Sequence, residues 1–191
     1  MPYRRNWYQD DEPAKDIAQG SSETHDIRSG SVVAPPASVT STNLSREELA
    51  SVYFSPSKDP EQNIIGFIQR TFKTLDIAMY SFTSRLILKA LREAMSRGVV
   101  VRIILDEGQA RIPSSVQPLL TPVLGNNLIL DKSKYLQHNK FAISDNVAVI
   151  TGSYNWTERA QKNYENLLIS RDQGIVDRYR TCFDELWTHN L

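Results

Sequence analysis

The sequence predicts an α/β fold: a mixed, mostly parallel β-sheet flanked by helices on both faces. Residues 75–105 show a strand, helix and strand pattern, which produces a parallel pair with a right-handed crossover. The second strand of that unit, 99–105, is almost continuously apolar, so both of its faces should be covered. Residues 141–150 hold two short apolar runs separated by Ser144-Asp145-Asn146, which predicts a β-hairpin or two neighbouring strands with a tight connection.

The other elements follow from local signals along the chain. Asp59-Pro60-Glu61 opens a helix that apolar spacing extends to about Lys73. Apolar residues at i, i+3, i+4, i+7 and i+8 from Ile87 predict a second helix, which Gly98 ends. Segment 108–126 is rich in proline, so we expect an irregular, substrate-facing loop with about one helical turn. Further expected elements are a short helix from Ser45, strands at 52–54, 75–82, 128–130 and 167–170, and a last helix at 173–188.

The first quarter of the chain differs in composition from the rest. Residues 20–45 are dominated by Ser, Thr, Gly and Pro, which cannot bury enough apolar surface to offset the entropy lost on ordering. We therefore expect a flexible polar arm or linker at 1–43 and one catalytic domain at 44–191.

Composition narrows the class of protein. No apolar run approaches the roughly 18 residues of a membrane span, so we expect no stable membrane insertion. No secretory signal is visible either, which predicts a cytoplasmic protein, and export of a processed precursor is the alternative. The single cysteine, Cys182, cannot form an internal disulfide. The net charge is zero, but residues 1–50 hold 5 Lys/Arg and 8 Asp/Glu, and residues 51–191 hold 17 and 14. This mildly basic domain suits a phosphodiester substrate, although ordinary solvated surface explains it as well.

The stretch from Gln137 to Glu165 carries the candidate chemistry. Residues two apart on a strand point to one face, so His138 should share a face with Lys140, and Ser153 with Asn155. An imidazole, a cation, a hydroxyl and an amide would then converge on one small anion.

This spacing resembles the HKD signature of the phospholipase D superfamily. The matching residues are His138, Lys140, Asp145, Gly152, Ser153 and Asn155, supported by segments 53–56, 80–83, 97–106 and 163–166. The resemblance covers about residues 51–189 and implies a phospholipase D-like fold. It is closest to single-motif members, the small bacterial endonucleases and the mitochondrial-surface type that cuts RNA or cardiolipin. It also implies a homodimer with a composite active site, because two motifs build one site in this family.

The motif residues supply what metal-independent cleavage of a phosphodiester needs. An imidazole, with a reference pKa of about 6.5, serves as nucleophile or acid near neutral pH, and we assign His138 to this role. By the resemblance, one His138 attacks phosphorus to give a phosphohistidine, and the other protonates the leaving oxygen and then activates water. Lys140, Ser153 and Asn155 would bind the phosphoryl oxygens, and no cofactor or metal is expected. Glu165 would orient an imidazole, and Asp145 would work structurally at the turn or pair with a cation.

The substrate class is left open by the motif, which recognises only the phosphodiester. The first hypothesis is a metal-independent endonuclease on DNA or RNA, with Lys132, Lys134 and Arg159 guiding the backbone and Trp156 either stacking on a base or packing in the core. The second is a phospholipase D acting on phosphatidylcholine or cardiolipin, with an apolar rim in segment 111–124. The third is a non-catalytic nucleic-acid-binding protein with a vestigial site.

Overall fold

The strand–helix–strand unit forms as the sequence predicts. The computed structural model describes residues 49–191, and the expected arm at 1–43 and the start of the helix expected from Ser45 lie outside this range. Strand β2 (Thr74–Met79) and strand β3 (Val100–Asp106) pair in parallel across helix α3 (Arg85–Ser96). The hydroxyl of Ser84 caps α3 by accepting a hydrogen bond from Ile87 N (3.2 Å), and Gly98 follows its end with φ +92°.

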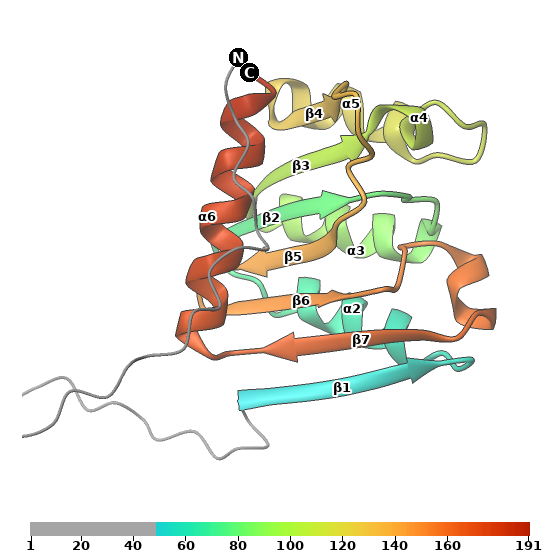
Figure 1. Cartoon of the computed structure of the whole chain (residues 1–191), viewed down its shortest axis with the longest axis vertical. Helices are drawn as coiled ribbons and strands as arrows, with labels where there is room; N and C mark the ends of the chain where they lie inside the picture. Colours follow the sequence, from blue (N-terminus) through green and yellow to red (C-terminus); the bar gives the residue numbers. More distant parts are fainter. Residues whose placement is uncertain (1–48) are drawn as a thin grey trace, which may run out of the picture. The chain divides into compact units, whose positions relative to one another are not determined.

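The sheet has seven strands in the order β1-β7-β6-β5-β2-β3-β4 (Figure 1). It is mixed, as expected, but the expectation of a mostly parallel sheet is wrong, because four of the six strand pairs are antiparallel. The predicted hairpin forms one of these pairs, β5 with β6, through a turn in which Asp145 and Asn146 both have positive φ (53° and 56°). The other three antiparallel pairs are not joined by tight turns, so local patterns could not predict their direction. The remaining strands are β1 (Ala50–Ser55), β4 (Leu128–Asp131), β5 (Lys140–Ser144), β6 (Ala148–Gly152) and β7 (Glu165–Ser170).

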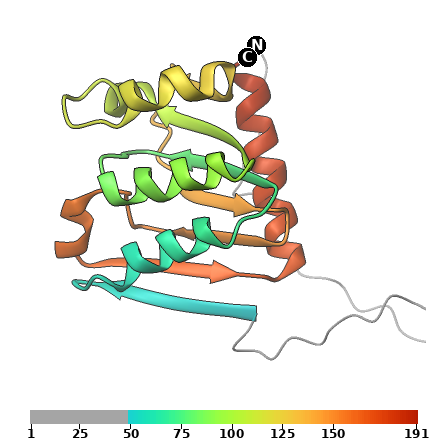
Figure 2. The same ribbon diagram turned by 180° about the vertical axis from the view of Figure 1, so that it is seen from behind.

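Helices cover both faces of the sheet, as predicted. Helix α2 (Asp59–Gln69) and α3 lie on one face (Figure 2), and α6 (Gln173–His189) lies on the other (Figure 1). Each helix buries one apolar stripe, so the sheet separates two cores. The larger core includes Ile64, Ile77, Leu91 and Trp156, and the smaller includes Phe141, Val149 and Phe183.

Segment 108–126 is more helical than expected. It contains most of a short α4 (Glu107–Ala110), the two-turn helix α5 (Gln117–Leu124) and most of the 3-10 turn η1 (Gly125–Asn127). Val116, Leu120 and Leu124 are buried, and their spacing of four residues forms a stripe that only a helix can present to the core. Pro118 is compatible with this because it lies in the first turn, where a backbone N–H needs no intrahelical partner.

The sheet topology brings distant parts of the sequence to one edge. Met79 at the end of β2 pairs with Lys140 at the start of β5, and Gly152 at the end of β6 pairs with Leu167 near the start of β7. The ends of four strands, β2, β5, β6 and β7, therefore meet at this edge, which we call the site edge. In the described part of the chain, no helix is both long and apolar enough to cross a membrane.

Candidate active site

His138 and Lys140 meet around an aromatic ring that follows β2. The imidazole of His138 packs edge-on against the ring of Tyr80, with 4.5 Å between centroids. The ammonium of Lys140 lies 5.1 Å from the same ring, and its Nζ donates a hydrogen bond to the backbone carbonyl of His138 (2.6 Å). Tyr80 is itself held in place, because its N–H donates to Asn139 O (2.9 Å) and its hydroxyl accepts from Gln109 (3.3 Å). The exposed imidazole and the buried lysine therefore share one support.

Ser153 and Glu165 form a second pair at the site edge. The hydroxyl of Ser153 donates to the Glu165 carboxylate (2.5 Å), which also accepts from the amide of Asn163 (3.0 Å). Gly152 makes this pairing possible, because a Cβ there would lie 2.2 Å from the carbonyl oxygen of Asn166. Its φ of +152° also belongs to the range that favours glycine.

Lys140 and Glu165 are coupled electrostatically. The Lys140 side chain is buried, and this desolvation lowers the pKa of its amine below the usual lysine value, while the negative charge of Glu165 opposes the shift. The pair places a cation and a carboxylate around the space beside His138. A bound phosphodiester would meet the cation in a partly dehydrated setting, where its field is stronger than in water.

Asn155 follows Ser153 by two residues and has an unpaired side-chain oxygen. Its Oδ1 is buried and accepts no hydrogen bond from residues 49–191. The neighbouring Tyr154 is also buried, with a hydroxyl that lacks a partner in the same range. Burial, followed by the charges of Glu61 and Glu165, raises the pKa of this hydroxyl well above its usual value, so it stays protonated.

Asp145 lies apart from the other motif residues. It follows β5, whereas Lys140 begins it, a separation of about 16 Å along a strand. Its carboxylate accepts hydrogen bonds from the backbone N–H groups of Phe72, Lys73 and Thr74 (2.7–2.9 Å). Of the two roles considered from the sequence, this geometry is that of structural work at the turn.

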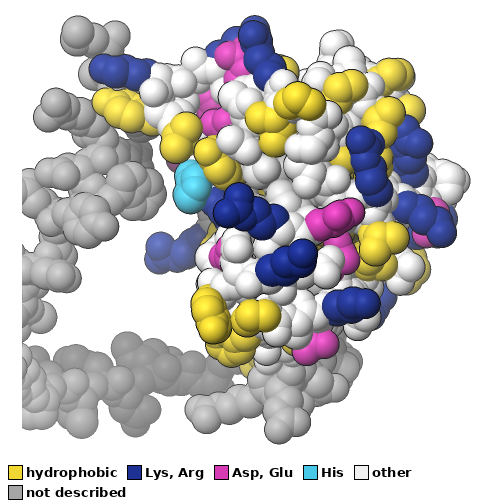
Figure 3. Space-filling view, turned by 90° about the vertical axis from the view of Figure 1, so that its right-hand side faces the viewer, with side chains coloured by type: hydrophobic (Ala, Val, Ile, Leu, Met, Phe, Trp, Pro, Cys, Tyr) yellow, Lys and Arg dark blue, Asp and Glu magenta, His cyan; other side chains and the backbone are white. Residues whose placement is uncertain are grey.

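The remaining candidates are distributed over the surface and the core. Trp156 is 1% exposed and packs edge-on against Phe82, so it cannot stack on a base in this structure. Lys132, Lys134 and Arg159 are exposed, and Figure 3 shows the site edge with a histidine at its surface and Lys and Arg side chains beside it. Within residues 49–191, no group of three His, Cys, Asp or Glu side chains has a metal-binding arrangement.

Sequence reasoning missed two supports of the site. It included Tyr80 only as part of segment 80–83 and gave it no role, but the ring of this residue contacts both His138 and Lys140. It did not consider Gln137, whose buried side chain accepts a hydrogen bond from Asn139 N (2.8 Å) and so shapes the approach to β5. The resemblance of segment 80–83 to the family pattern was the only signal in the sequence that could have indicated Tyr80.

Comparisons with known proteins identify relatives of this chain. The family model "Cardiolipin synthase, PLD-like domain" matches residues 64–187. The mitochondrial cardiolipin hydrolase of Xenopus tropicalis is 38% identical over 126 residues, and a phospholipase D of Rickettsia conorii is 34% identical over 140 residues. These matches cover 65% and 72% of the chain and 59% and 68% of the relatives, so the chain spans about three fifths of the first relative's length.

A solved structure shows the same fold. Nuc from Salmonella typhimurium, described as a phospholipase D family member, is 30% identical with a TM-score of 0.65, and the match covers 73% of this chain and 93% of that one. The family model spans well over half of the sequence, including both ends of the motif. The chain belongs to the phospholipase D superfamily, among its single-motif members.

Proposed function

We propose that this protein is a metal-independent phosphodiesterase that cleaves nucleic acid through a covalent phosphohistidine at His138. The observation that carries the proposal is the arrangement at the site edge. There an exposed imidazole and a desolvated ammonium lie on one tyrosine ring. A hydroxyl–carboxylate pair adds polar groups on the adjoining strands. These are the groups that stabilise a pentacoordinate phosphorus without a metal ion.

The reaction would proceed in two displacements. A ring nitrogen of His138 attacks phosphorus, the N–P bond forms, and the P–O bond to the leaving alkoxide breaks as a second imidazole donates a proton to it. That imidazole then takes a proton from water, whose oxygen attacks phosphorus, and the N–P bond breaks to return free His138. Lys140 neutralises the phosphoryl oxygens in both steps, and Ser153 and Asn155 direct hydrogen bonds to them. Glu165 orients an imidazole through its carboxylate.

The second imidazole would come from a second copy of the chain. His25 lies outside the described residues, and His189 ends α6, where it lines a groove with β4 instead of the site. A twofold axis near His138 would place two copies of that residue around one phosphorus. Exposed apolar side chains support such an interface, since Leu136, two residues before His138, is 66% exposed and Tyr164, directly before Glu165, is 93% exposed.

A lipid phosphodiester is the second candidate substrate. The relatives include proteins named mitochondrial cardiolipin hydrolase, and the matching family model is named for cardiolipin synthase. Helix α5 also carries Leu119 and Val123 with exposed side chains, which supplies part of the apolar rim expected for a lipase. Cationic surface favours nucleic acid, because six cations within residues 49–191 line two grooves that suit an extended polyanion.

Cleavage assays in chelator test the function. Purified protein should cut oligonucleotides in EDTA, His138→Ala should abolish cutting, and the matched control His189→Ala should retain it. A labelled phosphohistidine trapped at His138 would exclude the binding-protein alternative. Head-group release from cardiolipin vesicles, measured with the same samples, decides between the substrates. Loss of all cutting upon chelation would contradict the mechanism, and efficient head-group release with no oligonucleotide cleavage would contradict the nucleic-acid assignment.

A further inference from the structure

We propose that two cation-lined grooves beside α3 form a path that binds the sugar–phosphate backbone of a single-stranded nucleic acid beyond the scissile phosphate. This inference rests on the proposed function and extends it from the cleaved bond to the flanking nucleotides. The first groove lies between α3 and α5 and the second between α2, α3 and η2 (Glu158–Lys162). Six cations line them: Arg85, Lys89 and Arg92 in the first, and Lys58, Arg159 and Lys162 in the second.

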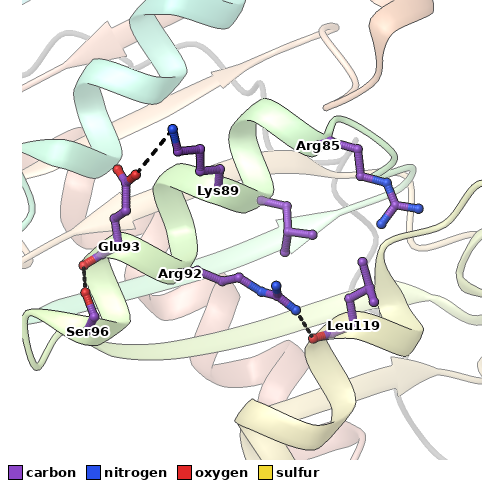
Figure 4. A pocket seen from close by; sticks show the side chains of 7 residues that line it. Arg85, Lys89, Arg92, Glu93, Ser96 and Leu119 are labelled. Atoms are coloured by element: carbon purple, nitrogen blue, oxygen red, sulfur yellow. Dashed lines mark hydrogen bonds and ion pairs between the residues drawn. The ribbon is translucent and has the colours of Figure 1, made fainter.

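The α3–α5 groove presents its cations in helical register. Arg85, Lys89 and Arg92 lie at i, i+4 and i+7, so they share one face of α3 over a rise of about 10 Å. Figure 4 shows Arg92 directed at α5, where it donates to the carbonyl oxygen of Leu119 (3.2 Å), and Lys89 beside Glu93 (3.9 Å). Arg85 makes no ion pair or hydrogen bond within residues 49–191. Glu93 is the groove's one carboxylate.

The α2–η2 groove also carries excess positive charge at its surface. Of its two carboxylates, Glu61 is only 5% exposed and accepts hydrogen bonds from Ser84 (2.7 Å) and Gln161 (2.6 Å). Glu158 is the exposed carboxylate against three exposed cations, Lys58, Arg159 and Lys162. The buried Glu61 therefore fixes the groove walls, and the exposed groups give the groove a positive surface.

Both grooves are tied to the motif loop. The carbonyl oxygen of Trp156 accepts hydrogen bonds from the N–H groups of Thr83 and Ser84 (2.9 Å each), which directly precede α3. Trp156 follows Asn155 directly, and η2 begins two residues later. The loop that follows Asn155, η2 and the start of α3 are therefore neighbours, and a nucleic acid bound at the site edge would meet these segments.

The shape and the charge favour a flexible polyanion over a membrane. A bilayer presents one continuous plane, whereas these cations line two separate, shallow grooves on either side of α3. A single strand can bend to follow both, and its phosphates recur along the backbone on the scale of the cation spacing. Neutralised phosphates release counterions, so binding should depend strongly on salt.

The test compares affinities for fluorescent oligonucleotides of 6 and 20 nucleotides, in an inactive His138→Ala background. R85Q/K89Q and R159Q/K162Q each remove two groove cations, and R178Q/R180Q removes two exposed cations of α6 as the matched control. We expect each groove variant to weaken binding of the 20-mer about tenfold and to lower the salt slope by about 1.4, at roughly 0.7 per lost contact for single strands. The affinity for the 6-mer should fall by less than the affinity for the 20-mer. The control variant should bind both oligonucleotides as tightly as the His138→Ala parent does.

Three outcomes would overturn the path. One is equal 20-mer affinity in the groove variants and the control. Another is a loss that is the same for the 6-mer and the 20-mer. The third is a groove-dependent preference for vesicles of anionic lipid over the 20-mer. These outcomes can be told apart from a failure of the proposed function. If the protein cleaves oligonucleotides but the groove variants bind the 20-mer as well as their parent does, only the proposed path is contradicted. If the groove variants bind more weakly but the protein with His138 intact does not cleave, only the proposed function is contradicted.

Discussion

Tyr80 is the residue through which the two main groups of the proposed site are positioned. Its ring is the common neighbour of the His138 imidazole and the Lys140 ammonium. The electron-rich face of an aromatic ring attracts a cation, and the ring edge fixes a neighbouring imidazole by packing. The sequence alone could not show this, because Tyr80 and His138 are 58 positions apart and meet only after β2 pairs with β5.

Two substitutions at Tyr80 should distinguish the contribution of its ring to activity from the contribution of its hydroxyl. Tyr80→Phe keeps the ring and loses only the hydrogen bond from Gln109, so activity should stay within about threefold of the unchanged protein. Tyr80→Ala removes the shared support, and kcat should fall roughly 10²-fold as the imidazole loses its orientation. Steady-state kinetics with circular dichroism as a folding control measures both. Equal loss in the two variants would show that the hydroxyl matters instead of the ring.

The buried position of Lys140 predicts an alkaline limit to activity. Burial lowers the pKa of its amine, against the opposing charge of Glu165, and only the protonated amine neutralises a phosphoryl oxygen. The ratio kcat/KM should therefore decline with rising pH at a pKa below the usual lysine value of about 10.4. Lys140→Arg, whose charge persists to higher pH, should shift this decline upward even if its activity is lower. If the alkaline decline of kcat/KM stays at the same pH in Lys140→Arg, the group that titrates is not Lys140.

At the scale of elements, the sequence predicted strands and helices well and their pairing less well. Periodicity located α3 and the hairpin because each depends on neighbours within a few residues. The antiparallel majority was missed because strand order depends on contacts between segments far apart, such as Ser55 with Glu165. Helix α5 was missed because Pro118 and Pro122 suggest a loop. Pro118 lies in the first turn, Pro122 lies inside the helix, and burial of the apolar stripe favours the helix in spite of it.

The junction of β6 and β7 should not tolerate a side chain at Gly152. A Cβ there would overlap the carbonyl oxygen of Asn166, which is backbone and cannot rotate away, so Gly152→Ala must separate the strands. We expect a loss of about 2 kcal/mol or more in the free energy of unfolding and a fall in activity, because Ser153 moves from Glu165. Urea denaturation measures the first and cleavage the second.

Gly66→Ala provides the matched control for this substitution. It lies in α2, where a Cβ would meet only the flexible tip of Arg70 at 3.3 Å, and alanine favours a helix by about 0.5–1 kcal/mol over glycine. This variant should be as stable as the parent or more so. Similar losses in both variants would mean that the close approach at Gly152 has no special cost.

Asp145 should act on stability instead of chemistry. Burial favours a higher pKa for its carboxyl, but hydrogen bonds from three backbone N–H groups outweigh it, so the folded pKa lies below the unfolded value of about 3.9. Its stabilising contribution is thus complete above about pH 4 and is lost as pH falls through the lower, folded pKa.

Asp145→Asn should therefore lower stability at pH 7 by about 1–2 kcal/mol and by less at pH 3. Glu185→Gln, which replaces an exposed carboxylate, serves as the control. It should leave the free energy of unfolding nearly unchanged at both pH 7 and pH 3. Urea unfolding at the two pH values gives the comparison, and cleavage is measured where both variants are folded. A fully stable but inactive Asp145→Asn protein would instead place this carboxylate in the catalytic step.

At the scale of the whole molecule, the sheet gathers the site at one edge and places structural polar groups at the other. His138, Lys140, Ser153 and Glu165 lie at the site edge, and the Asp145 turn lies at the opposite edge. The motif's spacing could be read from the sequence, but this division could not, because it depends on the direction of each strand. The motif residues therefore have different expected roles although they share one signature.

The proposed composite site predicts how mixtures of active and inactive chains should behave. If one site needs His138 from both copies, only dimers of two unmodified chains are active. When freely exchanging chains are mixed with His138→Ala, activity should follow the square of the unmodified fraction, so an equal mixture should retain about one quarter of the activity of the same total amount of unmodified chain. His189→Ala is the matched partner, and its mixtures should stay near full activity because that histidine lies beside β4. Exchange is verified by native mass spectrometry of differently tagged chains. A linear dependence on the unmodified fraction, or full activity at concentrations where the protein is monomeric, would show that one copy of His138 suffices and that the second proton carrier lies within the same chain.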